Sequence, residues 1–134
     1  MSARVCVIVD TSGSMDDATL NECVAECEKI IRTVGMPVDV LAVDTAIRGE
    51  GRFTSTRGLR DILIGGGGTR FASTFERLAR ESRHDVVIAL TDGEVWDLPS
   101  VKPGRFETVW CLRGPWARSK APAPWGVTVR IPKK

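Results

Sequence analysis

The sequence predicts an α/β domain built on a mainly parallel sheet. Two apolar runs, at residues 5–9 and 86–90, contain no polar residue, as is typical of central parallel strands that are buried on both faces. Segments with the three-and-four spacing of apolar residues found in helices alternate with the strand-like runs. With 134 residues, of which 43% are hydrophobic, the chain has the size and composition of a single domain over residues 1–134.

The first strand and the first helix have the clearest patterns. A strand is expected at residues 4–9, and a helix is expected at residues 16–34, where apolar residues recur at helical spacing. Two aspartates suit the N-terminus of this helix, because carboxylates are favoured there. A glycine at position 35 and a proline at position 37 are the signals that end it.

A hairpin and two more helices are expected next. Residues 38–43 form a strand, and residues 46–53 return as a strand interrupted by glycines, which is typical of a sheet edge. A short helix is expected near residues 59–63, and a longer helix with one apolar face is expected at residues 70–81. The remaining strands are expected at residues 86–90, 107–112 and 127–131.

The C-terminal part of the chain is expected to contain few helices. Residues 93–105 and 113–126 hold five prolines and lack helical periodicity. Since parallel strands need a crossover of about a dozen residues, these segments are long enough to cross the sheet as irregular loops. Three tryptophans in these segments are available to cover apolar surface; they are Trp96, Trp116 and Trp125. For Trp96, we favour a ring that fills space under a short loop over an aromatic at an interface.

Charge and cysteine content limit the classes of function that the chain could have. The 19 Lys and Arg residues nearly balance the 17 Asp and Glu residues, which does not suggest binding to nucleic acid or to a membrane surface. The chain enters a strand at once without a signal peptide, so we expect a cytoplasmic protein. The four cysteines lie in apolar runs or on the first helix without zinc-site spacing, and we expect them to be reduced and structural.

Oxygen-bearing side chains follow the two most apolar strands and the glycine run. Asp10, Ser12 and Ser14 alternate in a Gly-containing turn directly after the first strand. Thr69 closes the run GGGGT at residues 65–69, and Asp92 begins the next turn after an apolar strand. Ligands of open α/β sheets gather beyond the carboxyl ends of the strands, where the strand order reverses. The sequence therefore predicts one divalent-cation site built from three loops.

The ligand set selects a hard cation. Mg²⁺ prefers octahedral oxygen ligands and retains waters, and two carboxylates balance its charge while hydroxyls bind as neutral oxygens. At least one position would stay open, and a carboxylate from a partner protein is the natural occupant. The residues alone do not choose Mg²⁺ over Mn²⁺, and ligand type does not exclude Ca²⁺.

These motifs resemble the metal-ion-dependent adhesion site of von Willebrand factor type A (VWA) domains. All five expected ligands match, namely Asp10, Ser12, Ser14, Thr69 and Asp92. The resemblance covers nearly the whole chain and is nearest to compact bacterial intracellular VWA-like domains. It implies a Rossmann-like three-layer sandwich with strand order 3-2-1-4-5-6 and an antiparallel edge strand. It also implies Mg²⁺ or Mn²⁺, and a partner's Glu or Asp on the metal. Partners of the MoxR type of AAA+ ATPase, or metallopeptidase-like proteins, are implied as well.

Each residue also has a purely structural interpretation. The two serines could cap a helix, Asp10 and Asp92 could anchor turns, and Thr69 could be the N-cap of a helix that begins at residue 70. Their occurrence together, in order, favours the metal site. The neighbours expected at the rim or in a second shell are Gly13, Gly68, Arg70, Gly93 and Glu94.

The leading functional hypothesis is a metal-dependent protein-interaction module without catalytic activity of its own. The single histidine, His84, lies outside the three loops, and no nucleophile and base are paired in the sequence. One alternative is a phosphohydrolase with Asp10 as nucleophile, although Ser12 stands where aspartyl phosphatases have a second acid. A second alternative is a purely structural subunit whose thinly covered sheet contacts another chain near Trp116 and Trp125.

Overall fold

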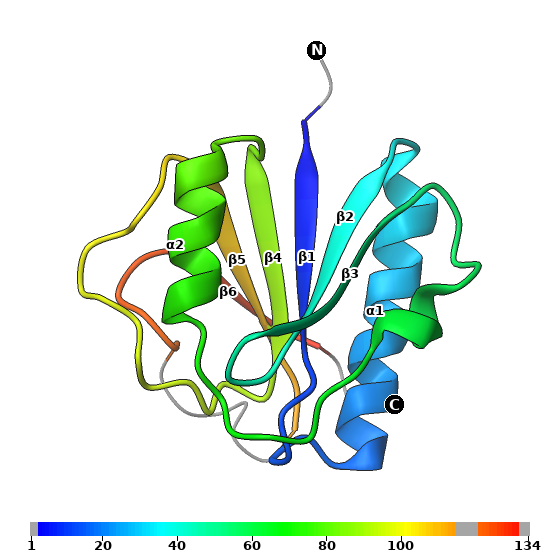
Figure 1. Ribbon diagram of the computed structural model, residues 1–134, viewed down its shortest axis with the longest axis horizontal. Coiled ribbons are helices and arrows are strands. Elements are labelled where there is room, and N and C mark those ends of the chain that lie inside the picture. The colour runs from blue at the N-terminus through cyan, green and yellow to red at the C-terminus, as the bar shows by residue number, and fades with distance from the viewer. Residues whose placement is uncertain (1–2, 115–120, 132–134) are drawn as a thin grey trace.

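Six strands form one sheet in the order β3-β2-β1-β4-β5-β6 (Figure 1). The computed structural model describes residues 3–114 and 121–131. Every pair of neighbouring strands is parallel except β2 and β3, which are antiparallel. The predicted Rossmann-like topology, with its antiparallel edge hairpin, is confirmed. The strands span Val5–Asp10 (β1), Val38–Val43 (β2), Ile47–Phe53 (β3), Val86–Thr91 (β4), Glu107–Leu112 (β5) and Val127–Arg130 (β6).

The strand order reverses between β1 and β4. The chain runs from β1 outward to β2 and β3, and then returns to place β4 on the other side of β1. All six residues of β1 are buried, as its uninterrupted apolar run predicts. Val9 pairs with Leu90, so that Asp10 and Thr91, the last residues of the two strands, lie side by side. This register positions the candidate site.

Helix α1 (Asp17–Val34) covers one face of the sheet. It begins where predicted, because the Asp16 carboxylate accepts a hydrogen bond of 2.7 Å from the backbone N–H of Thr19. It ends at Gly35, whose left-handed conformation, with φ of 69°, suits a residue without Cβ. The short 3₁₀ helix η1 (Leu59–Ile62) adds to the same hydrophobic cluster. The buried positions of α1 and the sheet residues beneath it include Val7, Val9, Cys23, Val24, Cys27 and Ile31.

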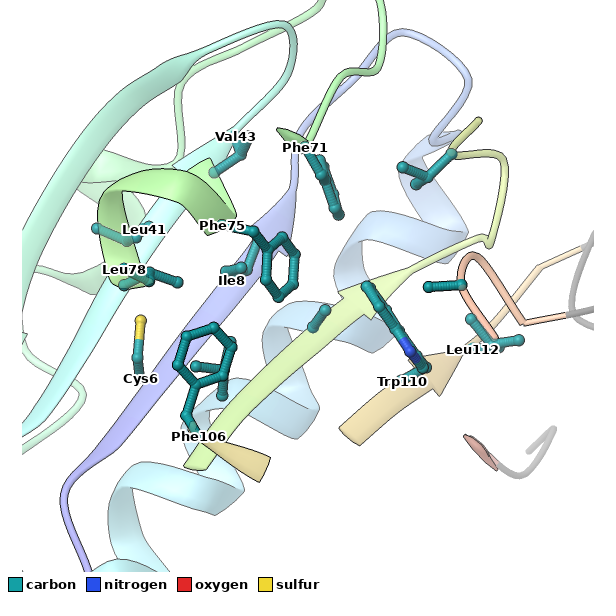
Figure 2. Packing of buried hydrophobic residues seen from close by; sticks show 14 residues of the cluster. Cys6, Ile8, Leu41, Val43, Phe71, Phe75, Leu78, Phe106, Trp110 and Leu112 are labelled. Atoms are coloured by element: carbon teal, nitrogen blue, oxygen red, sulfur yellow. The ribbon is translucent and has the colours of Figure 1, made fainter. Parts of the chain in front are cut away.

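Helix α2 (Ala72–Glu81) covers the opposite face and begins two residues after the expected start near residue 70. Asp97, from a distant loop, accepts hydrogen bonds from the backbone N–H groups of Phe71 and Ala72 at 2.9 and 3.0 Å. This carboxylate satisfies two of the free N–H groups at the start of the helix, a role that Thr69 does not fill. The buried residues of α2 form a second hydrophobic cluster with the sheet, which includes Ile8, Phe71, Phe75, Leu78 and Trp110. Figure 2 shows Phe75 of α2 beside Trp110 of β5 in this second cluster.

Irregular segments cover the sheet where a third crossover helix would lie. In the described part of the chain no helix follows α2, as predicted. Trp125 packs edge-on against Phe75, with ring centroids 5.5 Å apart, and its indole N–H donates to the carbonyl of Pro99. Trp125 thus covers part of the second apolar cluster. All four residues of the neighbouring strand β6 are exposed, so the expected contact with another chain near Trp125 stays a prediction. Trp116 lies outside the described residues.

The expected burial of Trp96 is wrong, because its residue is 78% exposed. The segment that carries Trp96 covers the sheet with the neighbouring Val95 instead, which is buried in the second cluster. The neighbouring Val95 therefore contributes to the core, and Trp96 is exposed to solvent.

The cysteines are free, as expected from their spacing. Cys6, Cys23 and Cys27 are completely buried, and this burial raises the pKa of their thiols to about 12. Cys111 is half-buried and packs against the α1 cluster. Because so little thiolate forms near neutral pH, the buried cysteines act as small apolar residues. Within the described residues, no helix has the length and apolarity that a membrane span requires.

Candidate metal centre

Three loops meet at the carboxyl edge of β1 and β4, which is the lower edge in Figure 1. The first loop follows β1 and carries a completely buried Asp10. Asp10 Oδ1 accepts hydrogen bonds from the backbone N–H of Ser12 at 2.9 Å and from the Ser12 hydroxyl at 2.5 Å. The Ser12 and Ser14 hydroxyl oxygens are 3.1 Å apart. Since the Ser12 hydroxyl gives its proton to Asp10, its oxygen keeps lone pairs that can bind a cation.

The second loop follows β4 and carries Asp92, which is 1% exposed. Asp92 Oδ1 accepts a 2.9 Å hydrogen bond from the backbone N–H of Glu94. Asp92 Oδ2 is buried and has no hydrogen-bond partner among the residues that the structure describes. A buried carboxylate oxygen without a partner is costly, by about 1–3 kcal/mol or more. The arrangement therefore provides an acceptor that only a cation, a proton or water can satisfy.

The two aspartates also influence each other electrostatically. Burial raises the pKa of Asp10 above its ordinary value, while hydrogen bonds from Ser12 and Thr91 act in the opposite direction. The negative charge of Asp92 raises the pKa of Asp10 further. Asp92 is thus close enough to Asp10, in a buried environment, to disfavour the charge of Asp10.

The glycine run lies against the first loop. The backbone N–H of Gly13 donates to the carbonyl of Gly67 at 2.8 Å, and the N–H of Gly66 donates to the carbonyl of Thr11 at 2.7 Å. A Cβ at Gly65 would lie only 2.2 Å from the Thr11 hydroxyl oxygen, so this contact requires glycine. The third loop is therefore fixed to the first by backbone contacts.

Thr69 is half-buried and follows this contact by two residues. The segment around it is tied to Asp44, the residue after β2. Asp44 Oδ2 accepts from the N–H of Gly67 at 3.1 Å, and the Asp44 carbonyl accepts from the N–H of Arg70 at 2.9 Å. These bonds fix the backbone on both sides of Thr69 beside the loop that carries Asp10.

The expected rim residues differ in exposure. Gly13, Gly68 and Arg70 are exposed, Glu94 is half-buried, and Gly93 is buried with a positive φ of 87°. Ser14 is exposed as well, so the edge is open to solvent on the side of the serine loop. The serine loop is therefore the solvent-facing side of the candidate site.

Two residues that position the site were missed by the sequence analysis. The Thr91 hydroxyl donates to Asp10 Oδ2 at 2.6 Å and accepts from the N–H of Gly93 at 3.1 Å, which links the first two loops. Asp44 organises the third loop. Their place at the carboxyl ends of the strands that flank β1 was the available signal, but their partners depend on strand register.

Asp44 leads to a prediction about stability and pH. Burial raises the pKa of Asp44, but hydrogen bonds from the Arg48 side chain and from backbone N–H groups outweigh this effect and lower it to about 2. The folded state then favours the charged carboxylate, so the stabilisation is fully present above the ordinary pKa of 3.8 and is lost as pH falls toward 2. Replacing Asp44 with Asn should lower the free energy of unfolding at pH 7 by about 2 kcal/mol.

Urea unfolding of wild type and Asp44→Asn at pH 7 and pH 2.5 measures this difference. We expect the difference in free energy of unfolding between the two proteins to be smaller at pH 2.5 than at pH 7. Asp61→Asn, at an exposed position, should have nearly the wild-type free energy of unfolding at both pH values. A gap of the same size at both pH values would show that the Asp44 charge does not contribute.

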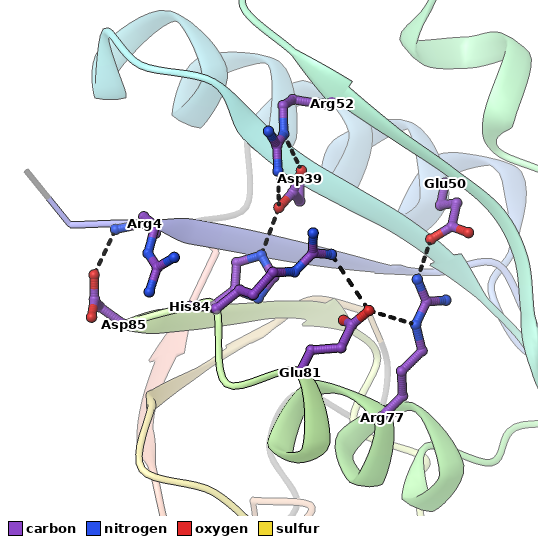
Figure 3. A network of polar contacts seen from close by, with 9 residues as sticks. Arg4, Asp39, Glu50, Arg52, Arg77, Glu81, His84 and Asp85 are labelled. Carbon is purple, nitrogen blue, oxygen red and sulfur yellow. Dashed lines mark hydrogen bonds and ion pairs between the residues drawn. The ribbon is translucent and has the colours of Figure 1, made fainter.

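The histidine lies at the opposite edge of the sheet. His84 precedes β4, and its Nε2 is 2.6 Å from Asp39 Oδ2, which also lies near Arg52 (Figure 3). It therefore takes no part in the three loops, as predicted. Across the described ranges, no three His, Cys, Asp or Glu side chains gather as potential metal ligands. A cation at the carboxyl edge would depend on two carboxylates together with hydroxyl oxygens.

The chain is similar to known proteins over most of its length. A family model described as "VWA-like domain (DUF2201)" matches residues 5–132. An uncharacterized protein of Thermotoga maritima is 29% identical over 96 residues, which cover 72% of this chain and 24% of that protein. The chain thus spans about a quarter of the length of this relative. No solved structure matches the chain.

Proposed function

Since this chain belongs to the family of VWA-like domains, we propose that its three loops hold a divalent cation that binds an acidic residue of a partner protein. The observation that carries the proposal is the buried Asp92 Oδ2, which no described group satisfies and which lies near a second buried carboxylate. A divalent cation would neutralise both charges at once. Water would satisfy the oxygen but leave the repulsion between the two carboxylates in place, and a proton would neutralise only one of them.

The donor set fits a hard cation. Asp10 and Asp92 provide two negative charges, and Ser12, Ser14 and Thr69 provide neutral hydroxyl oxygens. All five are oxygen ligands of the kind that Mg²⁺, Mn²⁺ and Ca²⁺ accept, and Mg²⁺ is the cation we favour. Thr91 would act through Asp10, because its hydrogen bond fixes the orientation of that carboxylate.

We propose that the site binds rather than catalyses. With two protein carboxylates, the cation stays electrophilic and can accept one more anionic oxygen from the open side, where Gly13 and Ser14 are exposed. A Glu or Asp of a protein partner provides such an oxygen. The resemblance to compact bacterial VWA-like domains makes a MoxR-type AAA+ ATPase one class of partner to examine, and a metallopeptidase-like protein another.

Mg²⁺-dependent capture tests the proposal. Calorimetric titration of Mg²⁺ into chelator-treated protein should give one site, which Asp10→Asn loses. Immobilised wild-type protein should then retain a partner in Mg²⁺ and release it in EDTA, whereas Asp10→Asn should retain none. Replacing one Glu or Asp of the captured partner by its amide should prevent binding. Equal retention with and without chelator would overturn the metal-dependent mechanism.

A further inference from the structure

Trp96 is the most exposed large hydrophobic residue of the described chain, at 78%. It lies four residues after Asp92, on the loop that carries the second carboxylate. Single exposed apolar residues are common and need no explanation by themselves. Tryptophan, however, is among the residues most enriched at the energetic centres of interfaces.

The loop holds this indole ring outward through fixed neighbours. On one side, Val95 is buried in the core and its N–H donates to the carbonyl of Gly93 at 2.9 Å. On the other side, the Asp97 carboxylate binds the backbone N–H groups of Phe71 and Ala72. Because both neighbours are fixed, the exposure of Trp96 follows from the fold rather than from a loose loop. A contact that uses it would require little ordering of the loop.

A second exposed apolar residue is hydrogen-bonded to the loop that follows β1. Ile64 is 57% exposed, and its carbonyl accepts a 2.8 Å hydrogen bond from the Thr11 hydroxyl, one residue after Asp10. The exposed Arg70 adds a positive charge at the same edge. The edge thus combines apolar side chains with groups that attract an acid, and this pattern fits a segment that is both acidic and apolar.

We propose that the partner segment whose carboxylate reaches the cation also carries an apolar side chain that packs on Trp96. The inference rests on the proposed function and adds the chemistry of the residue next to the acid. Four residues span about 14 Å at most, so Trp96 lies within that distance of Asp92 along the chain. The apolar residue of an extended partner therefore lies within about four positions of its Glu or Asp.

Random linear peptides displayed on phage provide the probe. Panning on wild-type protein in Mg²⁺, with elution by EDTA, should enrich peptides with a Glu or Asp and an aromatic or large aliphatic residue within about four positions. A synthetic peptide of the enriched sequence should bind Trp96→Ala at least tenfold more weakly than wild type. Trp96→Phe should restore much of the affinity. Val101→Ala should bind like wild type, because Val101 is equally exposed, at 76%, but lies further along the same loop.

The outcomes separate this inference from the proposed function. Enrichment of acidic peptides without an apolar neighbour, or equal binding by wild type and Trp96→Ala, overturns the role of Trp96 and leaves the metal-dependent site intact. If all the enriched peptides stay bound in EDTA, both the role of Trp96 and the metal-dependent site are overturned. Sedimentation of the wild type tests a second copy as the occupant: self-association that Trp96→Ala abolishes would assign the surface to a homodimer and overturn the peptide proposal.

Discussion

Asp92→Asn is expected to lose cation binding by about a hundredfold or more, while its fold in EDTA becomes more stable than that of the wild type. The loss should exceed the 10- to 100-fold typical of residues that only orient a ligand, because Asp92 would contact the cation itself. The gain in EDTA follows from the buried Asp92 Oδ2, which has no partner among described residues and faces a second buried carboxylate. Removing this charge should stabilise the cation-free protein by about 1 kcal/mol.

Thermal unfolding with EDTA and with Mg²⁺ measures both effects. Since a ligand that binds only the folded state raises its stability, Mg²⁺ should raise the Tm of the wild type and leave that of Asp92→Asn unchanged. Asp17→Asn is the matched control, because Asp17 is an exposed carboxylate three residues beyond Ser14 and should respond to Mg²⁺ like the wild type. The prediction fails if Mg²⁺ raises the Tm of all three proteins equally.

Trp110→Ala is expected to destabilise the fold by about 3–5 kcal/mol, as is typical of a large aromatic removed from a core. Trp110 is completely buried, and its ring centroid lies 5.5 Å from that of Phe75 and 5.6 Å from that of Trp125. Its indole N–H donates to the Trp125 carbonyl at 3.0 Å. An irregular segment rather than a helix covers this part of the sheet. Trp110 connects that segment to α2, because it contacts both Trp125 and Phe75.

Urea unfolding monitored by circular dichroism compares this variant with two others. Trp96→Ala should change the free energy of unfolding by no more than about 0.5 kcal/mol, since its ring is exposed. Trp110→Phe should fall between the two, because it keeps an aromatic ring and loses the hydrogen bond. If Trp96→Ala and Trp110→Ala lowered the free energy of unfolding by similar amounts, Trp110 would not be the residue that holds the irregular segments on the sheet.

Much of the fold could be predicted because its signals are local. The apolar run of β1 is buried on both faces, the glycine at position 35 ends α1, and the glycine-interrupted strand β3 lies at an edge. The placement of Asp10 and Asp92 beyond adjacent strands also follows from sequence, since both come directly after apolar runs that pair in the sheet. These features depend on residues close together in the chain.

The incorrect predictions concern contacts between distant residues. The pattern does not reveal how α2 begins, because its start is capped by Asp97, which lies 26 residues from Phe71. The exposure of Trp96 depends on Val95 filling the core in its place. The contribution of Thr91 became visible only when the register placed it beside Asp10. Pattern and composition carry no signal for such pairings.

The location of a bound cation tests the central claim most directly. Crystals of the protein soaked in Mn²⁺ would be measured near the manganese absorption edge, where anomalous scattering identifies the metal. We predict one strong anomalous peak within bonding distance of Asp92 Oδ2 and the Ser12 hydroxyl, with an outside oxygen completing the coordination. Two results would contradict the account. One is an anomalous peak elsewhere, such as at His84 and Asp39 on the opposite edge of the sheet. The other is the absence of any anomalous peak at the carboxyl edge of the sheet at saturating Mn²⁺.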